Sequence, residues 1–429
     1  MSSFRSGGDG VSRRLRFRAI GRHLLFSMRP ARLLALGYLS YMLAGWLLLS
    51  LPFAREVPLR LIDTLFTAVS AVSTTGLTTV DTAGSYSFAG EFIVLVLIQL
   101  GGLGYMTVSS FAFLSLRQRL SGARKHTTQA VFGLPVGINA ARFVRAVVVF
   151  TLICEATGAL ALWYLFHKHG IDNALWQGVF HAISAFCTAG FSLFSTSVEG
   201  FRGDMAINWV ISILSLFGAL GFIVVVDAWQ WLRSEKRIMG YSSAVIWRFS
   251  FFLIIGATFV LALREPGISS LPDREIWMAA FFQSMSAATT VGFNSVPIAA
   301  ISPQTAVILI VLMLIGASPA GTGGGLKTTT FAALFAQMIS VARGRPQTIL
   351  MGQRVPEARM RLASASLSLY LAMLLAALIL LLAYEPGVPL LALVFESVSA
   401  LSTVGLSMGI TGTLGDMGKA IIIVLMYVG

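Results

Sequence analysis

The chain has 429 residues, of which 56% are hydrophobic and only 11% are charged. A water-soluble globule of this length needs more polar surface, so the composition excludes one and indicates a membrane protein. The formal net charge of +13 comes from basic residues that gather in a few segments between apolar runs. Membrane topology explains this distribution, so no nucleic-acid partner is expected.

The first 32 residues form a basic segment with eight arginines ahead of a full-length apolar run. This pattern is not that of a cleaved signal peptide. Three later segments are also basic, whereas acidic residues mostly occupy the loops between them. Because basic loops stay on the cytoplasmic side, we expect the N-terminus and these segments to be cytoplasmic. The later basic residues are Arg117, Arg119, Arg124, Lys125, Arg142 and Arg145, then Arg233, Lys236, Arg237 and Arg248, then Arg343, Arg345, Arg354, Arg359 and Arg361.

Apolar runs follow one another along the chain, and a helix needs roughly 20 apolar residues to cross about 30 Å of hydrocarbon. Some runs reach this length and others fall short, including a last run of ten residues from Ala420. The other predicted spans cover residues 33–51, 92–114, 144–165, 209–226, 250–263, 307–316 and 367–383.

A short polar motif with one glycine recurs four times between these spans, and each copy has a phenylalanine four residues before its leading serine. The motif glycines are separated by 114, 102 and 113 residues, which indicates internal repeats. The copies read SAVSTTGLT (70–78), SAFCTAGFS (184–192), SAATTVGFN (286–294) and SALSTVGLS (399–407). The predicted units are a basic segment over 1–32 and repeats over 33–120, 140–233, 244–342 and 363–429, the last with a short final helix.

Each repeat contains two apolar spans and, between them, a segment of about 12 residues that is too short to cross the bilayer. We interpret it as a re-entrant helix followed by extended chain. Non-helical backbone at membrane depth must be enclosed by protein or line a wet cavity. The sequence therefore predicts an all-α membrane protein in which four re-entrant loops meet on one pore axis, surrounded by eight outer helices.

A ring of such loops can point backbone carbonyls inward, where they replace the hydration shell of a monovalent cation. Glycine reaches the required φ values, and the short helices direct the negative ends of their dipoles toward the ion. One copy alone is more typical of helix packing through small residues, but the fourfold recurrence favours a cation filter. The predicted filter residues are Thr74, Thr75, Gly76, Leu77, Thr188, Ala189, Gly190, Phe191, Thr290, Val291, Gly292, Phe293, Thr403, Val404, Gly405 and Leu406.

These motifs, together with LLLSLPFA and GASPAGTGGGLKTTT, resemble the Trk/Ktr/HKT superfamily of potassium uptake proteins, most closely its KtrB-type membrane subunits. The resemblance implies K⁺ as the transported ion, possible Na⁺ dependence and no organic cofactor on this chain. It also implies a homodimer and a cytoplasmic RCK-type regulatory subunit that binds nucleotide. In plant relatives a serine at the first motif glycine accompanies sodium preference, so Gly76 favours potassium. The basic loops suit either an acidic partner surface or anionic membrane lipids.

The third repeat differs from the others because its second span breaks at GASPAGTGGGLKTTT (316–330), where proline and glycines disfavour helix. The resemblance makes this loop an intramembrane gate. A Walker nucleotide loop is not expected, because Leu326 replaces its second glycine. Lys327 is either a cation near the cytoplasmic mouth that repels ions or meets a carboxylate, or a side chain that extends to the interface. The predicted gate residues are Gly316, Ser318, Pro319, Gly321, Thr322, Gly323, Gly324, Gly325 and Lys327.

Polar residues at membrane depth need partners. Glu396 precedes the fourth motif, and we predict that it supports the filter by accepting hydrogen bonds; the arginine that relatives place near this acid is absent here. His181 is predicted to be a hydrogen-bonded structural residue, and Asp63 and Asp273 to cap their short helices.

A coupled symporter with alternating access is the alternative function, with Glu155, His181 or Glu396 as a proton relay. An enzyme is not expected, because the sequence has no H-E-x-x-H motif and no paired aspartates at helical spacing within a span. The two cysteines, Cys154 and Cys187, lie in apolar sequence and act as small apolar residues.

Overall fold

The computed structural model describes residues 30–115, 140–233, 240–319 and 321–429. Most of the predicted basic segment 1–32, and the basic stretch 117–125, lie outside these residues. Helices dominate the described chain, and its strands are the two-residue pair β1 (Ile349–Leu350) and β2 (Gln353–Arg354), which is antiparallel. The all-α prediction is confirmed.

The helices follow a recurring order of one long helix, one buried helix of 12 to 17 residues, which we call the short helix, and then a second outer helix or pair of helices. The third short helix, with 17 residues, is longer than the predicted length of about 12. The first group is α2 (Pro30–Leu49), α3 (Leu61–Val72), α4 (Thr82–Ser85) and α5 (Phe88–Ser115), and the second is α7 (Ala140–Lys168), α8 (Ala174–Phe186), α9 (Met205–Leu220) and α10 (Phe222–Leu232). The third is α11 (Tyr241–Arg264), α12 (Pro266–Ser269), α13 (Asp273–Thr289), α14 (Pro303–Ile315) and α15 (Thr328–Ala342), and the fourth is α16 (Glu357–Tyr384), α17 (Leu390–Leu401) and α18 (Asp416–Val428). Proline stands directly before α13, α16 and α17, where its fixed φ and missing N–H suit a helix start.

Among the described residues, three helices are long and apolar enough to cross a membrane by themselves, namely Val144–Lys168, Tyr241–Arg264 and Glu357–Tyr384. The other apolar helical stretches are shorter, for example Ala35–Leu49 of α2 and Phe88–Gly104 of α5. Large apolar side chains stay exposed on the long helices, for example Phe252 at 70% and Ile379 at 68%. Such surfaces suit contact with lipid, so the protein is a membrane protein.

The second outer helices are interrupted in three groups, not in the third alone. Gly104 has φ 71° and ψ 145° inside α5, and Gly221 has φ 88° and ψ 154° between α9 and α10. The prediction that the second span is broken only in the third repeat is therefore wrong. Each of the first two breaks falls at the final glycine of a Gly-x-Leu-Gly sequence, at 101–104 and 218–221, because only glycine adopts these backbone angles without strain.

The four short helices form the centre of the molecule. Their motif phenylalanines are fully buried and pack against protein on all sides. The second outer helix of each group packs against the short helix of the next group: α5 against α8, α9 against α13, α14 against α17, and α18 against α3. The last contact returns to the first group, so the chain closes on itself around the short helices. The buried phenylalanines are Phe66, Phe180, Phe282 and Phe395.

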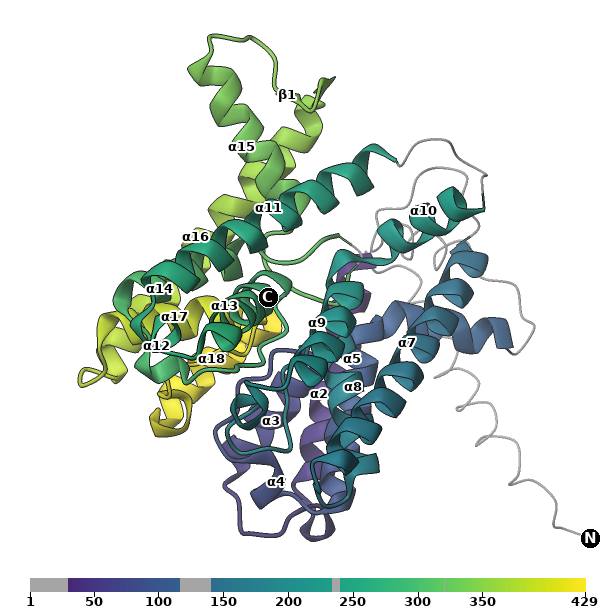
Figure 1. The fold of residues 1–429 in the computed structure, drawn as a ribbon, viewed down its shortest axis with the longest axis vertical. Coiled ribbons are helices and arrows are strands. Elements are labelled where there is room, and N and C mark those ends of the chain that lie inside the picture. Colours follow the sequence, from purple (N-terminus) through teal and green to yellow (C-terminus); the bar gives the residue numbers. More distant parts are fainter. Residues whose placement is uncertain (1–29, 116–139, 234–239, 320) are drawn as a thin grey trace, which may run out of the picture.

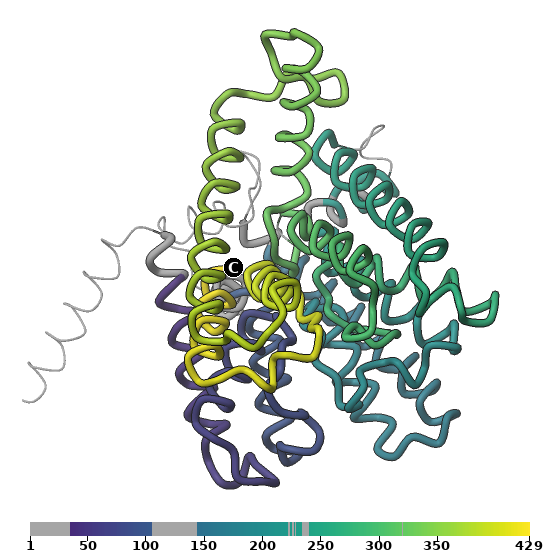
Figure 2. Tube along the Cα trace, turned by 90° about the vertical axis from the view of Figure 1, so that its left-hand side faces the viewer, coloured from purple at the N-terminus to yellow at the C-terminus, as the bar shows by residue number. Residues whose placement is uncertain are grey.

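One part of the molecule extends away from this centre. Figures 1 and 2 show α15 and the start of α16 rising together, with β1 and β2 at their tip. The hydroxyl of Tyr241, at the start of α11, donates to the Leu350 carbonyl at 2.7 Å and holds the hairpin against α11. The end of α18 is exposed, and a Cβ atom added to Gly429 would lie within 3.0 Å of the Leu401 carbonyl.

Candidate functional site

The short helices α3, α8, α13 and α17 all end in the same backbone turn. A threonine adopts left-handed φ values of 50–58°, and the motif glycine two residues later has φ between 67° and 94°. Left-handed backbone costs a non-glycine residue about 1–2 kcal/mol, so four copies indicate one shared geometry that the surrounding structure enforces. The threonines are Thr74, Thr188, Thr290 and Thr403, and the glycines are Gly76, Gly190, Gly292 and Gly405.

A backbone hydrogen bond closes each turn. The N–H of the residue between threonine and glycine donates to the carbonyl of the leading motif serine. The pairs are Thr75 to Ser70 at 2.8 Å, Ala189 to Ser184 at 2.8 Å, Val291 to Ser286 at 3.1 Å and Val404 to Ser399 at 2.8 Å. The residues after the glycines are buried as well, namely Leu77, Phe191, Phe293 and Leu406.

The four turns meet in a closed ring, which we call the glycine ring (Gly76, Gly190, Gly292 and Gly405). A Cβ atom added to any of these glycines would lie within 3.0 Å of a carbonyl oxygen in the next turn. Real Cβ atoms do not approach so closely, so only glycine fits. The approached carbonyls belong to Ala189 for Gly76, Val291 for Gly190, Val404 for Gly292, and Thr75 for Gly405.

The leading serines hold the ring in two ways. Ser70 and Ser399 accept hydrogen bonds from the N–H of the motif glycine in their own turn, at 3.1 Å each. Ser184 and Ser286 instead donate to the carbonyl of the residue after the glycine, at 2.8 and 2.6 Å. The side chains and short helices thus fix the backbone of the ring from behind.

The segment between α14 and α15, which we call the crossing loop (residues 316–327), lies against the motif threonines. The N–H of Gly324 donates to Thr290 Oγ1 at 3.0 Å, and Thr188 Oγ1 donates to Thr322 Oγ1 at 3.1 Å. A Cβ atom at Gly324 would overlap Thr403 Oγ1. The crossing loop therefore contacts three of the four turns. All predicted gate residues belong to it, although helix α15 already begins at Thr328.

Backbone hydrogen bonds anchor the other side of the crossing loop to the end of α9. The N–H groups of Ser318 and Thr322 donate to the carbonyls of Ala219 and Gly218 at 3.1 and 3.0 Å. A Cβ atom on Gly221 would meet the Pro319 carbonyl within 3.0 Å. The break in the second group is therefore the place where the crossing loop packs.

Lys327 turns back on its own loop, where its Nζ donates to the Gly323 carbonyl at 2.5 Å. Among the described residues it forms no ion pair with a carboxylate. The element before the loop is helix α14 and not a strand, which excludes a Walker loop.

The three residues considered for a proton relay, Glu155, His181 and Glu396, are all buried. Glu155 accepts from Gln99 Nε2 at 3.1 Å, and the Cys187 thiol lies 3.7 Å from its other oxygen. His181 bonds to the Gln177 carbonyl at 2.8 Å and to the Ser192 hydroxyl at 2.9 Å. The carboxylate of Glu396 accepts from the Thr411 hydroxyl.

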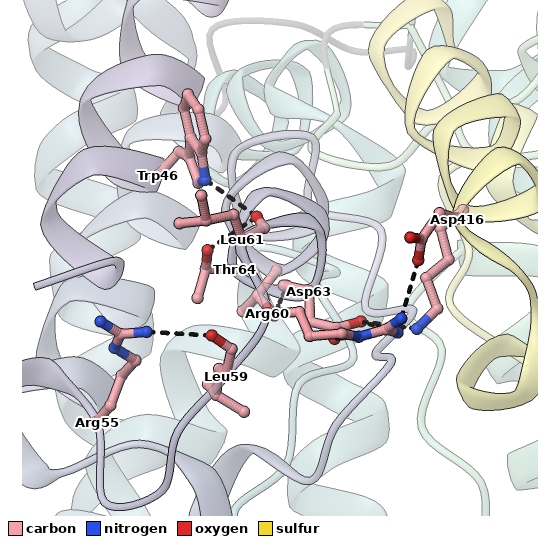
Figure 3. A network of polar contacts seen from close by, with 10 residues as sticks. Trp46, Arg55, Leu59, Arg60, Leu61, Asp63, Thr64 and Asp416 are labelled. Carbon is pink, nitrogen blue, oxygen red and sulfur yellow. Dashed lines mark hydrogen bonds and ion pairs between the residues drawn. The ribbon is translucent and has the colours of Figure 1, made fainter.

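The capping prediction for Asp63 and Asp273 is wrong. The N-caps of α3 and α13 are Arg60 and Pro272, without a side-chain cap bond, and the two aspartates lie inside the first turns. Asp63 instead pairs with Arg60 at 2.9 Å (Figure 3) and with Lys419 at 2.7 Å. Sequence reasoning missed this partner because Lys419 lies 356 residues away.

Taken together, the apolar helices and the closed ring of short helices define a helical membrane protein with four similar turns around one centre. The family model of TrkH, described as cation transport protein, matches residues 43–429, and the chain belongs to this family. The predicted Trk/Ktr membership is thus confirmed, and the protein is a transport protein rather than an enzyme.

Several curated proteins are similar over most of their length. Ktr system potassium uptake protein B from Vibrio alginolyticus is 35% identical over 93% of this chain and 88% of that protein. The protein of the same name from Bacillus subtilis is 33% identical over 93% and 90%, and potassium/sodium uptake protein NtpJ from Enterococcus hirae is 32% identical over 94% and 90%. The crystal structure of the potassium transporter TrkH from Vibrio parahaemolyticus has the same fold, with a TM-score of 0.71 at 21% identity over 92% of this chain and 81% of that one.

Proposed function

We propose that the chain takes up K⁺ across the cell membrane through one pore whose filter is the glycine ring. The observation that carries the proposal is the cyclic order of contacts, in which each motif glycine abuts a carbonyl of the next turn. A dehydrated monovalent cation needs a ring of carbonyl oxygens, and side chains larger than hydrogen would block the approach of the backbones. The printed names of the relatives support K⁺ as the ion.

The negative ends of the short helices add to this attraction. Helices α3, α8, α13 and α17 all end directly before the ring, so their carboxyl-terminal dipole ends lie close to it. No carboxylate has to enter the pore, because backbone oxygens and helix ends supply the negative potential.

The crossing loop serves as the gate in this proposal. It contacts Thr188, Thr290 and Thr403, the residues that begin three of the four turns, so an ion that leaves the filter on this side meets the loop. Lys327 adds a positive charge there and repels cations until the loop moves. The exposed arginines beyond α15 favour a cytoplasmic position for this side, with the N-terminus also cytoplasmic.

As part of the same proposal, the chain has the partners that are expected from its family. A homodimer, a cytoplasmic RCK-type subunit and a dependence on Na⁺ fit the relatives, one of which is named a potassium/sodium uptake protein. The basic tip around Arg345 and Arg354 gives such a subunit, or anionic lipid, a surface to bind.

Ion flux tests the filter. The purified chain in K⁺-loaded vesicles should release K⁺, and Gly292→Ser should lower the preference for K⁺ over Na⁺, because the new Cβ would displace the Val404 carbonyl. Gly170→Ser is the matched control: Gly170 also has a positive φ, of 71°, but no atom in the described part of the chain lies within 4 Å of an added Cβ. An unchanged preference in Gly292→Ser, in a protein that still conducts, would refute the filter assignment.

A further inference from the structure

The residue that follows the buried phenylalanine of each short helix is polar in all four groups. Each of these residues precedes its motif glycine by nine positions, and at most 1% of its surface is exposed. Equal spacing places them at equivalent points behind the glycine ring. They are Thr67, His181, Gln283 and Glu396.

In the second group this residue ties the helix to the chain beyond the ring. The Gln177 carbonyl can only accept, so His181 donates to it from Nδ1 at 2.8 Å. The neutral ring then accepts at Nε2 from the Ser192 hydroxyl at 2.9 Å. Ser192 lies two residues after Gly190, and stacking of the imidazole on Phe194, with centroids 4.7 Å apart, holds the ring plane.

The fourth group makes the same connection through one more hydroxyl. Thr411 donates to the Glu396 carboxylate and lies 2.9 Å from the hydroxyl of Ser407. Ser407 follows Gly405 by two residues, as Ser192 follows Gly190. Different side chains thus reach the same point of the two loops.

The first and third groups lack such a connection among the described residues. Thr67 bonds back to the Asp63 carbonyl of its own helix at 3.0 Å. The buried amide of Gln283 has no hydrogen-bond partner in the described part of the chain. The connections therefore belong to alternate members of the ring, which stand opposite each other in its cyclic order.

We infer that His181 and Glu396 are positioning residues that hold two opposite turns of the glycine ring, through Ser192 and Ser407, and thereby set its ion selectivity. The inference rests on the proposed filter. Discrimination between K⁺ and Na⁺ depends on the positions that the carbonyl oxygens can adopt. A turn that is hydrogen-bonded from behind holds its oxygens in place. Loss of one of these hydrogen-bonded connections lets that turn move in around the smaller ion, Na⁺.

A double-mutant cycle tests the inference in vesicles containing the full chain. His181→Phe preserves an aromatic ring beside Phe194 but cannot accept from Ser192, and Ser192→Ala removes the other partner. We expect each variant to lower the K⁺ to Na⁺ flux ratio by about fivefold, the effect of one lost hydrogen bond. The K⁺ to Na⁺ flux ratio of the double variant should be no lower than that of either single variant. His181→Gln, whose amide oxygen can still accept, should regain part of the ratio.

Gln283→Met is the matched control, because it changes the equivalent position where no connection exists. Its flux ratio should stay within about twofold of the parent. Ratios within about twofold for both His181→Phe and Ser192→Ala, or losses that add in the double variant, would overturn the inference. Ser192→Ala removes a single oxygen, so it still tests the connection if gel filtration shows that His181→Phe does not fold.

The Gly292→Ser experiment separates the two proposals. If Gly292→Ser lowers the ratio while the His181 and Ser192 variants do not, the filter stands and the positioning role is wrong. If none of the three variants changes the ratio, the proposed filter itself is wrong.

Discussion

Lys419 Nζ lies 2.7 Å from Asp63 Oδ1, and both side chains are almost fully buried. The pair joins α18, the last helix, to α3, the first short helix, and so closes the ring of helix groups. Arg60 and the exposed Asp416 extend the network outward (Figure 3). A buried pair of this kind links two distant parts of the chain, because either charge left alone would be costly.

Lys419→Met should therefore lower the free energy of unfolding by about 3 kcal/mol, since it leaves the Asp63 carboxylate buried with less compensation. Adding Asp63→Asn should restore part of this loss. The thermal midpoint of the detergent-solubilised protein measures both effects. Asp416→Asn should leave the midpoint almost unchanged, because its pair with Arg60 is exposed. Equal losses in Lys419→Met and Asp416→Asn would contradict this account.

Glu265 gives a prediction about pH. Burial raises the pKa of Glu265, but hydrogen bonds from Thr305, Ser302 and the Gly267 N–H outweigh burial and hold the pKa below its usual value. Its contribution to stability is thus present above the unfolded pKa of about 4.3 and is lost as the pH falls through the lower folded value.

Glu265→Gln should accordingly lower the thermal midpoint at pH 7, and the gap to the parent should shrink below about pH 4. Glu357→Gln, an exposed carboxylate at the start of α16, is the control and should show no such gap. A gap that grows in acid would show that the carboxylate does not stabilise the fold in its ionised form.

The crossing loop should restrict flux through its hydrogen bonds to the ring. Thr322→Val removes the hydroxyl that bonds to Thr188 and should raise K⁺ flux severalfold, since a hydrogen bond contributes about 1 kcal/mol. Deletion of residues 317–324 should raise it further and weaken control by a cytoplasmic partner. Thr330→Val, on α15, is the control. Lower flux in a folded deletion variant would mean that the loop supports the open pore.

The two helix breaks provide a matched pair of glycines. Gly104→Ala costs only the strain of a positive φ, about 1–2 kcal/mol, because no atom of the described residues lies closer than 3.5 Å to its added Cβ. Gly221→Ala carries the same strain and also pushes on the crossing loop at Pro319 and Ser318. We expect altered K⁺ flux from Gly221→Ala only, measured at equal protein content. Equal flux in the two variants would argue against coupling between this break and the loop.

Glu155 distinguishes a channel from a proton-coupled symporter. Its carboxylate accepts a hydrogen bond from Gln99 and lies 3.7 Å from the Cys187 thiol, so side-chain partners occupy it. Glu155→Gln should therefore leave K⁺ flux independent of an imposed pH gradient, as in the parent. Uphill K⁺ movement driven by a pH gradient in the parent, and lost in Glu155→Gln, would establish the symporter alternative instead.

Local sequence predicted much of the centre of the molecule. Small residues, a glycine at fixed spacing and a segment too short to cross the bilayer indicated the four half-length helices, and proline with four glycines indicated the non-helical crossing loop. The repeat boundaries stay predictions. The breaks at Gly104 and Gly221 were missed, although both end a Gly-x-Leu-Gly sequence, because isolated glycines are common in membrane helices.

The sequence by itself determined the membrane class, the family and the positions of the glycines, since hydrophobic content and backbone freedom are properties of single residues and short segments. Only the tertiary structure decided which carbonyl each glycine faces, that Lys419 pairs with Asp63, and that His181 and Glu396 reach corresponding serines. These contacts join residues of different helices or distant parts of the chain. Their distances depend on how the helices pack, which no local pattern specifies.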